Sequence, residues 1–432
     1  MPVISFPYGK KTKEYQINEA EFKGELVSKL HSYQAAATQE ELVAQAFAMP
    51  VGTKPLHELV KDKQKVVIIA SDHTRPVPSK IIIPPMLAAI RKGNPTAEIT
   101  ILIATGCHRD ATRAELEEKF GKEIVEQECI INHNCDTSEF EYCGKLPSGG
   151  YLLLNKLAVK ADLLVAEGFI EPHFFAGYSG GRKSVLPGVA SRNTVLYNHN
   201  AEFIANECAR TGRLEQNPIH EDMLFAARKV GLDFICNVVI NANKEVIYAV
   251  AGDCEQAHEQ GCEFLERNCK VERVLADIVI TSNGGYPLDQ NIYQAVKGMT
   301  AAEATVKRGG VIIMLAQSCD GHGAPEFYQT FKEEKDLDRM LSEFWKTPKE
   351  TTKVDQWQSQ IFARVLQHAK VIYISDTTDE MVRDMHMIPA HSIAEAMEIA
   401  KQILGNPQAS VVAIPDGVSI IITGNTKGLR NK

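Results

Sequence analysis

Short runs of apolar and β-branched residues alternate along this chain with polar or glycine-rich turns and amphipathic stretches. VVIIASD at residues 66–72 precedes HTRPVPSK, ITILIATG at 99–106 precedes CHRDATRAELEEKF, and DLLVAEG at 162–168 precedes FIEPHFFAGYSGG. Apolar runs of this length, bounded by turn residues, predict buried strands. The alternation predicts an α/β fold with mostly parallel sheets, in which ligands lie beyond the carboxyl ends of the strands.

A second series of strands and helices begins near residue 273. Its predicted strands lie at residues 277–282, 311–317 and 370–375. A chain of 432 residues favours more than one domain. We therefore predict two α/β domains, an N-terminal one at residues 1–268 and a C-terminal one at 273–400. We expect residues 405–432 to return to the N-terminal domain and complete it.

Composition removes several classes of protein from consideration. The net charge of −8 is spread along the chain and leaves no basic surface for nucleic acid. No apolar run reaches the roughly 18 residues of a membrane span, and the first residues lack the pattern of a secretory signal. Ten cysteines without a C-x-x-C pair indicate buried thiols and not a zinc site or disulfides. We expect a cytoplasmic protein that binds neither nucleic acid nor membrane.

The segment EPHFFAGYSGGRKSVLPG at residues 171–188, with TVLYNHN at 194–200, carries the strongest chemical signal. It sets His173, Lys183 and His199 around a glycine-rich turn. Glycines let backbone amides approach a ligand closely, and imidazoles bind metals or transfer protons. The segment therefore predicts a bound cofactor that carries phosphate or metal.

The same turn differs from a nucleotide-hydrolysing phosphate loop. The pattern G-x-x-x-x-G-K-[ST] requires glycine where this chain has Arg182, and Pro187 disfavours the helix that should follow. We predict an anion-binding loop of another design around Ser179, Gly180 and Gly181. A purely structural turn is the first alternative, and an ATP- or GTP-hydrolysing loop is the second.

Polar side chains at other strand ends are candidates for the same site. His108 follows one predicted strand and His173 another, and paired bases suit proton chemistry on two faces of one carbon. Arg75 lies in a proline-stiffened loop, where a guanidinium can bind a carboxylate. Gln294 and Lys297 share one face if their segment is helical. Taken singly, each has a plain alternative: a capping histidine, a surface salt bridge or a common helical spacing.

Together these segments resemble the nickel-dependent lactate racemase family. DHTRPVP, GCHRD, EPHFFAGYSGGRKSVLPGV, YNHN, GGYPLDQNIYQAVKG and DQWQ occur in this order from about residue 70 to 360. The central segment is long enough to be a specific signature. The resemblance implies an isomerase of two α/β domains, with the active site in the cleft between them.

The resemblance also implies a cofactor and a role for each candidate residue. The cofactor is a nickel pincer nucleotide, pyridinium-3-thioamide-5-thiocarboxylic acid mononucleotide, which enzymes of cofactor synthesis supply and which is attached covalently to Lys183. His199 is the implied nickel ligand, and His108 and His173 are the implied acid and base. The other implied residues bind cofactor (Asp72, Ser179, Gly180, Gly181, Trp357) or substrate (Arg75, Tyr293, Gln294, Lys297).

The implied reaction interconverts D- and L-lactate through hydride transfer to the cofactor and a bound pyruvate. Hydride transfer avoids a carbanion next to a carboxylate, which is poorly stabilised. Relatives act on malate, longer aliphatic, aromatic or sugar-derived 2-hydroxy acids, so the substrate side chain stays open. Two hypotheses from other classes also stay open: a zinc hydrolase that binds metal through His108, His173 and His199, and a non-catalytic nucleotide-binding protein.

Overall fold

A six-stranded sheet forms the centre of the first lobe, which we define as residues 39–269. The computed structural model describes residues 1–424 of the chain. The sheet has the order β13-β12-β9-β4-β5-β6, and only its edge strand β13 is antiparallel. The strands are β4 (Lys65–Ser71), β5 (Glu98–Ala104), β6 (Cys129–Asn132), β9 (Leu163–Phe169), β12 (Leu232–Ile240) and β13 (Val246–Gly252).

Helices cover both faces of this sheet, which explains why its central strands are almost entirely apolar. Every residue of β9 is buried, as expected for a parallel strand between two helical layers. One face packs against α1 (Gln39–Ala48) and α3 (Ser79–Gly93). The other packs against α9 (Pro218–Val230) and α10 (Gln256–Cys269). The remaining elements of this lobe are α2 (Leu56–Leu59), α4 (Arg113–Phe120), α5 (Lys122–Gln127), α6 (Lys156–Val159), α7 (Arg192–Asn198), α8 (Ala201–Ala205), β7 (Phe140–Lys145), β8 (Tyr151–Asn155), β10 (Pro172–His173), β11 (Gly177–Tyr178) and η2 (Gly181–Ser184).

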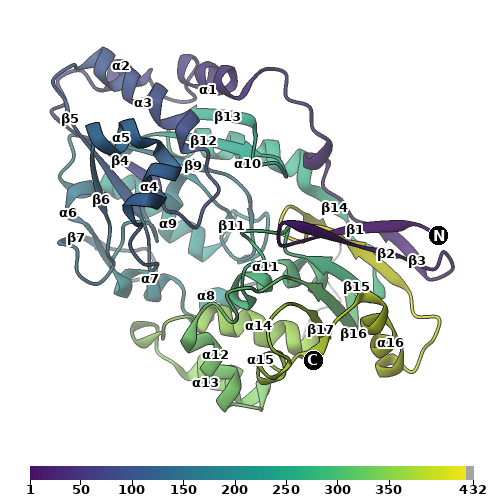
Figure 1. Cartoon of the computed structure of the whole chain (residues 1–432). Coiled ribbons are helices and arrows are strands. Elements are labelled where there is room, and N and C mark those ends of the chain that lie inside the picture. Colours follow the sequence, from purple (N-terminus) through teal and green to yellow (C-terminus); the bar gives the residue numbers. More distant parts are fainter. Residues whose placement is uncertain (425–432) are drawn as a thin grey trace.

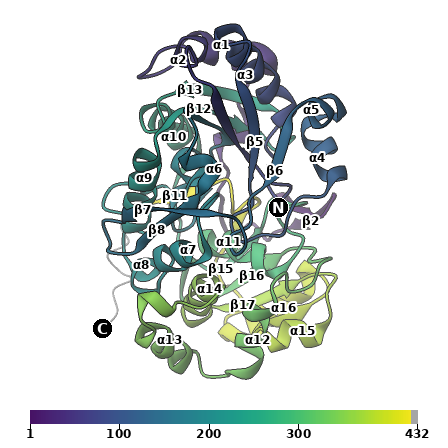
Figure 2. The same cartoon turned by 90° about the vertical axis from the view of Figure 1, so that its left-hand side faces the viewer.

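A second six-stranded sheet, entirely parallel, forms the second lobe, which we define as residues 3–25 and 270–424. Its order is β18-β17-β16-β15-β19-β3. The strands are β3 (Phe22–Glu25), β15 (Ala276–Ser282), β16 (Val306–Leu315), β17 (Lys370–Ile374), β18 (Ile388–Ala390) and β19 (Val411–Ile414). Figure 2 shows this lobe below the first, with its green and yellow elements together.

Helices and a hairpin cover the second sheet. One face packs against α11 (Ile292–Glu303), α12 (Pro325–Glu333) and α14 (Gln356–His368). The other packs against α16 (Ile393–Leu404) and the hairpin of β1 (Val3–Tyr8) and β2 (Lys11–Gln16). The remaining elements outside the first lobe are η1 (Lys29–Ser32), β14 (Lys270–Glu272), α13 (Leu337–Lys346), η3 (Lys349–Thr351), α15 (Asp379–Asp384) and β20 (Ile421–Thr423).

The predicted architecture of two α/β domains with mostly parallel sheets is confirmed. The predicted strands at 66–72, 99–106 and 162–168 correspond to β4, β5 and β9, and those at 277–282, 311–317 and 370–375 to β15, β16 and β17. One cluster of buried apolar residues runs through both lobes, so they share a continuous core. No helix within residues 1–424 has the length and apolar character needed to cross a membrane.

The ends of the chain lie elsewhere than the sequence predicted. Residues 405–432 were expected to complete the N-terminal domain, but β19 pairs with β15 and β3 in the second sheet. Figure 1 shows the purple N-terminal strands beside the yellow C-terminal ones. The physical reason is that all four residues of β19 are buried, and β15 offers a free parallel edge opposite β16. Residues 425–432 lie outside the described residues, and the domain limits 1–268 and 273–400 stay predictions.

Candidate active site

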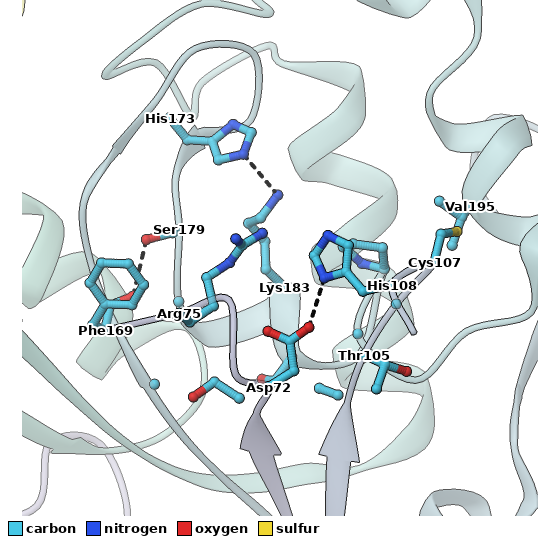
Figure 3. Close-up of a pocket in the computed structure, with 18 of the residues that line it drawn as sticks. Asp72, Arg75, Thr105, Cys107, His108, Phe169, His173, Ser179, Lys183 and Val195 are labelled. Atoms are coloured by element: carbon cyan, nitrogen blue, oxygen red, sulfur yellow. Dashed lines mark hydrogen bonds and ion pairs between the residues drawn. The ribbon is translucent and has the colours of Figure 1, made fainter. Parts of the chain in front are cut away.

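A cleft separates the carboxyl ends of β4, β5 and β9 from helices α11 and α14 of the second lobe. Figure 3 shows side chains of the first lobe that line it, among them Asp72, His108 and Lys183. The cleft encloses roughly 1160 Å³ of space free of protein atoms, including the part open to solvent. Nearly all residues singled out from the sequence line it: Asp72, Arg75, His108, His173, Ser179, Gly180, Lys183, His199, Tyr293, Gln294, Lys297 and Trp357. Gly181 is the exception.

Asp72 and His108 form an ion pair across the ends of β4 and β5. The Oδ2 atom of Asp72 lies 2.7 Å from Nδ1 of His108, and the amide and hydroxyl of Thr74 donate to Oδ1 at 3.1 and 2.6 Å. Burial alone would raise the pKa of Asp72, but the hydrogen bond from His108 and the charges of His108 and Arg75 hold it well below its usual range. A permanent carboxylate therefore orients the His108 ring, as in other acid–base pairs.

His173 lies on β10 and its ring faces Lys183. Its Nδ1 accepts a hydrogen bond from the amide of Ala176 at 3.3 Å, and its Nε2 lies 3.4 Å from Nζ of Lys183. Burial, followed by the charges of Lys183 and Lys297, lowers the pKa of His173 well below its usual value. The imidazole is therefore neutral at neutral pH. Because Nδ1 accepts, Nε2 carries the proton in that state.

Lys183 lies in the short helix η2, directly after the glycine-rich turn. Burial, then the charges of Arg182 and Arg75, lowers the pKa of Lys183 well below its usual range. A neutral amine is the nucleophilic form of lysine. It is also the form that can accept the Nε2–H of His173. The structure thus favours a reactive amine at this position.

The glycines of the turn allow close packing against Asn237, and they do not leave the amide of Gly181 free for a ligand. Gly180 and Gly181 have φ of +74° and +51°, and a Cβ on Gly180 would lie 2.7 Å from Oδ1 of Asn237. That same oxygen accepts the amide of Gly181 at 2.7 Å. Ser179 donates its hydroxyl to the carbonyl of Phe169 and accepts the amide of Glu171. The Gly181 amide is therefore engaged with Asn237, and its contact with a cofactor stays a prediction.

Arg182, which breaks the phosphate-loop pattern, is fully buried beneath this turn. Its guanidinium donates to the carbonyls of Ala176 and Tyr178 at 2.7 and 2.8 Å, and to Nδ1 of His220 at 3.0 Å. Burial lowers the pKa of Arg182 to about 10, so it remains a cation at neutral pH. No carboxylate within residues 1–424 pairs with it. The arginine fixes the turn that presents Lys183, and no sequence pattern predicted this role.

His199 caps the carboxyl end of α7 and is buried against two aromatic rings. Its ring centroid lies 5.1 Å from that of Phe175 and 5.1 Å from that of Trp357. Its Nδ1 is buried without a hydrogen-bond partner. Burial, then the charge of Lys183, lowers the pKa of His199 to about 3. A neutral imidazole with an unsatisfied nitrogen at a cleft is the form that binds a metal ion.

The second lobe contributes side chains from the first turns of α11 and α14. The hydroxyl of Tyr293 donates to Asp355 at 3.1 Å, and Nε2 of Gln358 donates to the Tyr293 carbonyl at 2.5 Å. Burial, then the charge of Arg75, lowers the pKa of Lys297 to about 8. Arg75 has no carboxylate partner in the described part of the chain. Arg75 and Lys297 therefore face the cleft without a direct ion-pair contact to any carboxylate within residues 1–424.

Two residues that shape the site were not predicted from the sequence. Glu167 lies within the apolar strand β9, and Asp355 begins α14 with a left-handed backbone, φ +59°. The only signal for Glu167 was a carboxylate in an otherwise apolar run. Among residues 1–424, no three His, Cys, Asp or Glu side chains converge as a metal site. This geometry disfavours the hypothesis of one zinc ion bound by His108, His173 and His199.

The comparison with protein families covers most of the chain. The profile described as "Lactate racemase N-terminal domain" matches residues 8–212. The profile described as "Lactate racemase C-terminal domain" matches residues 271–422. Together they include every element that lines the cleft.

Individual relatives agree over almost the full length. The chain is 52% identical to the lactate racemase of Thermoanaerobacterium thermosaccharolyticum, covering 98% of this chain and 99% of that protein. It is 49% identical to the lactate racemase of Lactiplantibacillus plantarum, covering 98% and 100%. The structure of the lactate racemase apoprotein from T. thermosaccharolyticum superposes with a TM-score of 0.94 at 51% identity, covering 98% of this chain and 100% of that one.

Proposed function

Because this chain belongs to the lactate racemase family, we propose that it interconverts D- and L-lactate in the cleft between its two lobes. Racemases are isomerases, so the chain is an enzyme of that class. The observation that carries the proposal is the pair of imidazoles, His108 and His173, set in one cleft with cations that have no carboxylate partner. Acid–base groups beside unpaired cations suit a small substrate that carries a carboxylate and an exchangeable proton.

Arg75 and Lys297 bind the substrate carboxylate in this proposal. Arg75 presents a planar guanidinium that binds a carboxylate through two hydrogen bonds. Lys297 adds a second positive charge from the opposite lobe. Gln294 and Tyr293, on the same helix, orient the remaining polar atoms of the substrate. Binding from both lobes holds the reacting carbon in a fixed position.

His108 and His173 exchange the hydroxyl proton of the substrate. His173 has the electrostatic environment of a neutral base, and the carboxylate of Asp72 holds the His108 ring through its Nδ1 atom. Each histidine serves one enantiomer. Once the hydroxyl is deprotonated, C2 loses its hydrogen as hydride and becomes the planar carbonyl carbon of pyruvate. Return of hydride to the other face yields the opposite enantiomer.

The residues present fit a nickel pincer nucleotide, which supplies the acceptor and donor of hydride when it is bound. Lys183 offers a neutral amine for covalent attachment. His199 offers an unsatisfied, neutral imidazole for nickel. Asp72, Trp357 and the turn at Ser179 and Gly180 line the space around it. Cofactor-synthesis enzymes are the maturation partners that this proposal requires.

A panel of single-enantiomer acids tests the function. The chain is produced together with the cofactor-synthesis enzymes and incubated separately with L-lactate, malate, 2-hydroxybutyrate, mandelate and a sugar acid. Chiral chromatography then measures the opposite enantiomer or epimer. We expect lactate to be racemised with the highest kcat/KM. Racemisation of another acid without lactate would assign the alternative substrate, and zinc in place of nickel by elemental analysis would refute the proposal.

His199→Ala is expected to lose nickel at least tenfold more readily than the native protein. Loss of a hydrogen-bond partner of a metal ligand already costs about 10–100-fold in affinity, and here the ligand itself is removed. Nickel per chain after dialysis, measured by elemental analysis, gives the result independently of activity. His391→Ala, an exposed histidine far from the cleft, is the matched control. Full nickel content in His199→Ala would assign the ligand role to another residue.

The KM for lactate is expected to rise as the pH rises through about 8. Lys297 binds the carboxylate as an ammonium ion, and its pKa is lowered to about 8 by burial. Below that pH the charge is present, and above it the charge is lost, so KM increases up to about tenfold by pH 9. Lys297→Arg keeps its charge and should show no such rise. The test is to measure KM from pH 6 to 9.5 in both proteins. Identical pH profiles would contradict the assignment of Lys297 to carboxylate binding.

A further inference from the structure

The carboxylate of Glu167 joins the two ends of the loop that carries Asp72 and Arg75. Glu167 lies on β9 and is only 3% exposed. Its Oε1 accepts hydrogen bonds from the amide and hydroxyl of Ser71, at 2.9 and 2.8 Å, and from the hydroxyl of Ser79 at 3.1 Å. Ser71 ends β4 and Ser79 begins α3. One oxygen atom therefore closes the seven-residue loop at 72–78.

The loop is also held at its middle. Nζ of Lys119, on α4, donates to the carbonyl of Arg75 at 3.2 Å. Burial lowers the pKa of Lys119, and the charges of Glu167 and Asp72 oppose that effect, which places these acidic groups near the same amine. Pro76 and Pro78 limit the backbone further. The loop is thus fixed at both ends and at its centre.

The cost of this arrangement argues that it serves the site. Neighbouring side chains of β9 on the same face, Val165 and Phe169, belong to an apolar cluster. A carboxylate at that depth loses its hydration, and Oε2 of Glu167 is buried without a hydrogen-bond partner. An apolar residue would suit strand packing better at this position. A buried charge kept despite this cost is consistent with a positional requirement.

We propose that Glu167 is a positioning residue for the racemase site, which acts through the 72–78 loop on Asp72 and Arg75. The inference rests on the proposed function for its kinetic consequence but not for its structural one. When the loop is released, the Asp72–His108 pair and the guanidinium of Arg75 lose their fixed geometry. Small displacements of this kind reduce turnover strongly.

Three variants separate this role from general stabilisation. Glu167→Gln keeps the shape but not the charge, and Ser79→Ala releases only one end of the loop and is the mildest test if Glu167→Gln folds poorly. Asp277→Asn is the matched control. Its carboxylate accepts the amide and hydroxyl of Ser410 at 2.9 and 2.5 Å, but at the amino end of β15, away from the cleft.

The first readout is hydrogen–deuterium exchange of the chain without cofactor, followed by mass spectrometry. We expect peptides covering residues 72–79 to exchange at least about fivefold faster in Glu167→Gln and Ser79→Ala, and at the native rate in Asp277→Asn. This result does not depend on racemase activity. Native exchange of the loop in both site variants would overturn the proposal.

The second readout is kinetic and uses the cofactor-loaded enzyme. We expect kcat/KM to fall about tenfold or more in Glu167→Gln, through both a higher KM and a lower kcat, with less than a threefold change in Asp277→Asn. In an Arg75→Ala background, the further loss from Glu167→Gln should shrink, because the loop then has less to position. Full additivity of the two substitutions, or a kinetic loss without faster exchange, would indicate direct contact with a ligand and refute the positioning role.

Discussion

Lys183→Ala is expected to abolish both covalent attachment of the cofactor and racemase activity. The buried turn fixed by Arg182 presents Lys183 beside His173, and burial lowers the pKa of Lys183 well below its usual range, which favours the neutral amine. Alanine lacks the amine, which is the only nucleophile to which we assign covalent attachment of the cofactor. Intact-protein mass spectrometry of chain produced with the cofactor-synthesis enzymes measures the adduct. We expect the mass of the unmodified chain and a fall in activity to background.

The matched control for this experiment is Lys297→Ala. It removes a second amine from the same cleft, where the lysine binds substrate in our proposal and not cofactor. This control should keep the mass adduct while its KM rises. An adduct of unchanged mass in Lys183→Ala would refute the assignment of the attachment site. Loss of the adduct in both variants would show that attachment depends on the charge of the cleft.

His108→Ala and His173→Ala are expected to show opposite enantiomer preferences in single turnovers. A planar keto acid accepts hydride on either face only if a proton donor lies on the matching side. Equilibrium requires that loss of either base slows kcat/KM equally in both directions, so steady-state rates do not distinguish the histidines. The amount of bound pyruvate formed from each pure enantiomer distinguishes the two histidines. We expect one enantiomer to form pyruvate in each variant, with a loss of about 10²–10⁴-fold for the other.

The control here is His391→Ala, which should oxidise both enantiomers at the native rate. His391 is exposed and does not line the cleft. Equal loss for both enantiomers in both active-site variants would contradict the two-base mechanism. That outcome would indicate a single shared base, with the other histidine in a binding role.

Local sequence patterns were sufficient to predict the central strands of both sheets and several residues of the cleft. β4, β5 and β9 are short apolar runs between turn residues, and parallel strands place their carboxyl ends on one edge of the sheet. The loops that follow them therefore bring His108 and His173 together although they are 65 positions apart in the printed sequence. The roles of Lys183 and His199 required a family resemblance, because spacing alone did not separate attachment from metal binding.

Features that depend on distant contacts were missed or wrongly placed. β19 is an apolar run that could join either sheet. Only its pairing with β15 shows that it belongs to the second one. In the sequence, Glu167 is a charged residue in an otherwise apolar strand. Its partners Ser71 and Ser79 are identified only in the folded chain. Arg182 appeared as a mismatch in a motif, whereas its contacts are with carbonyls of its own turn. Sequence patterns predict helices and strands, but they do not predict which groups contact a buried charged side chain.

The second sheet draws strands from both ends of the chain, which sets an order for folding during synthesis. All strands of the first sheet lie between Lys65 and Gly252, so the strands of that sheet can pair while the ribosome is still making the rest of the chain. β3, near the amino end, can join the second sheet only after β19 emerges, because β19 is its one partner strand among residues 1–424. Throughout that interval the nascent amino-terminal strand has no neighbour in the sheet. The catalytic cleft, which needs both lobes, is thus assembled only when translation is nearly complete.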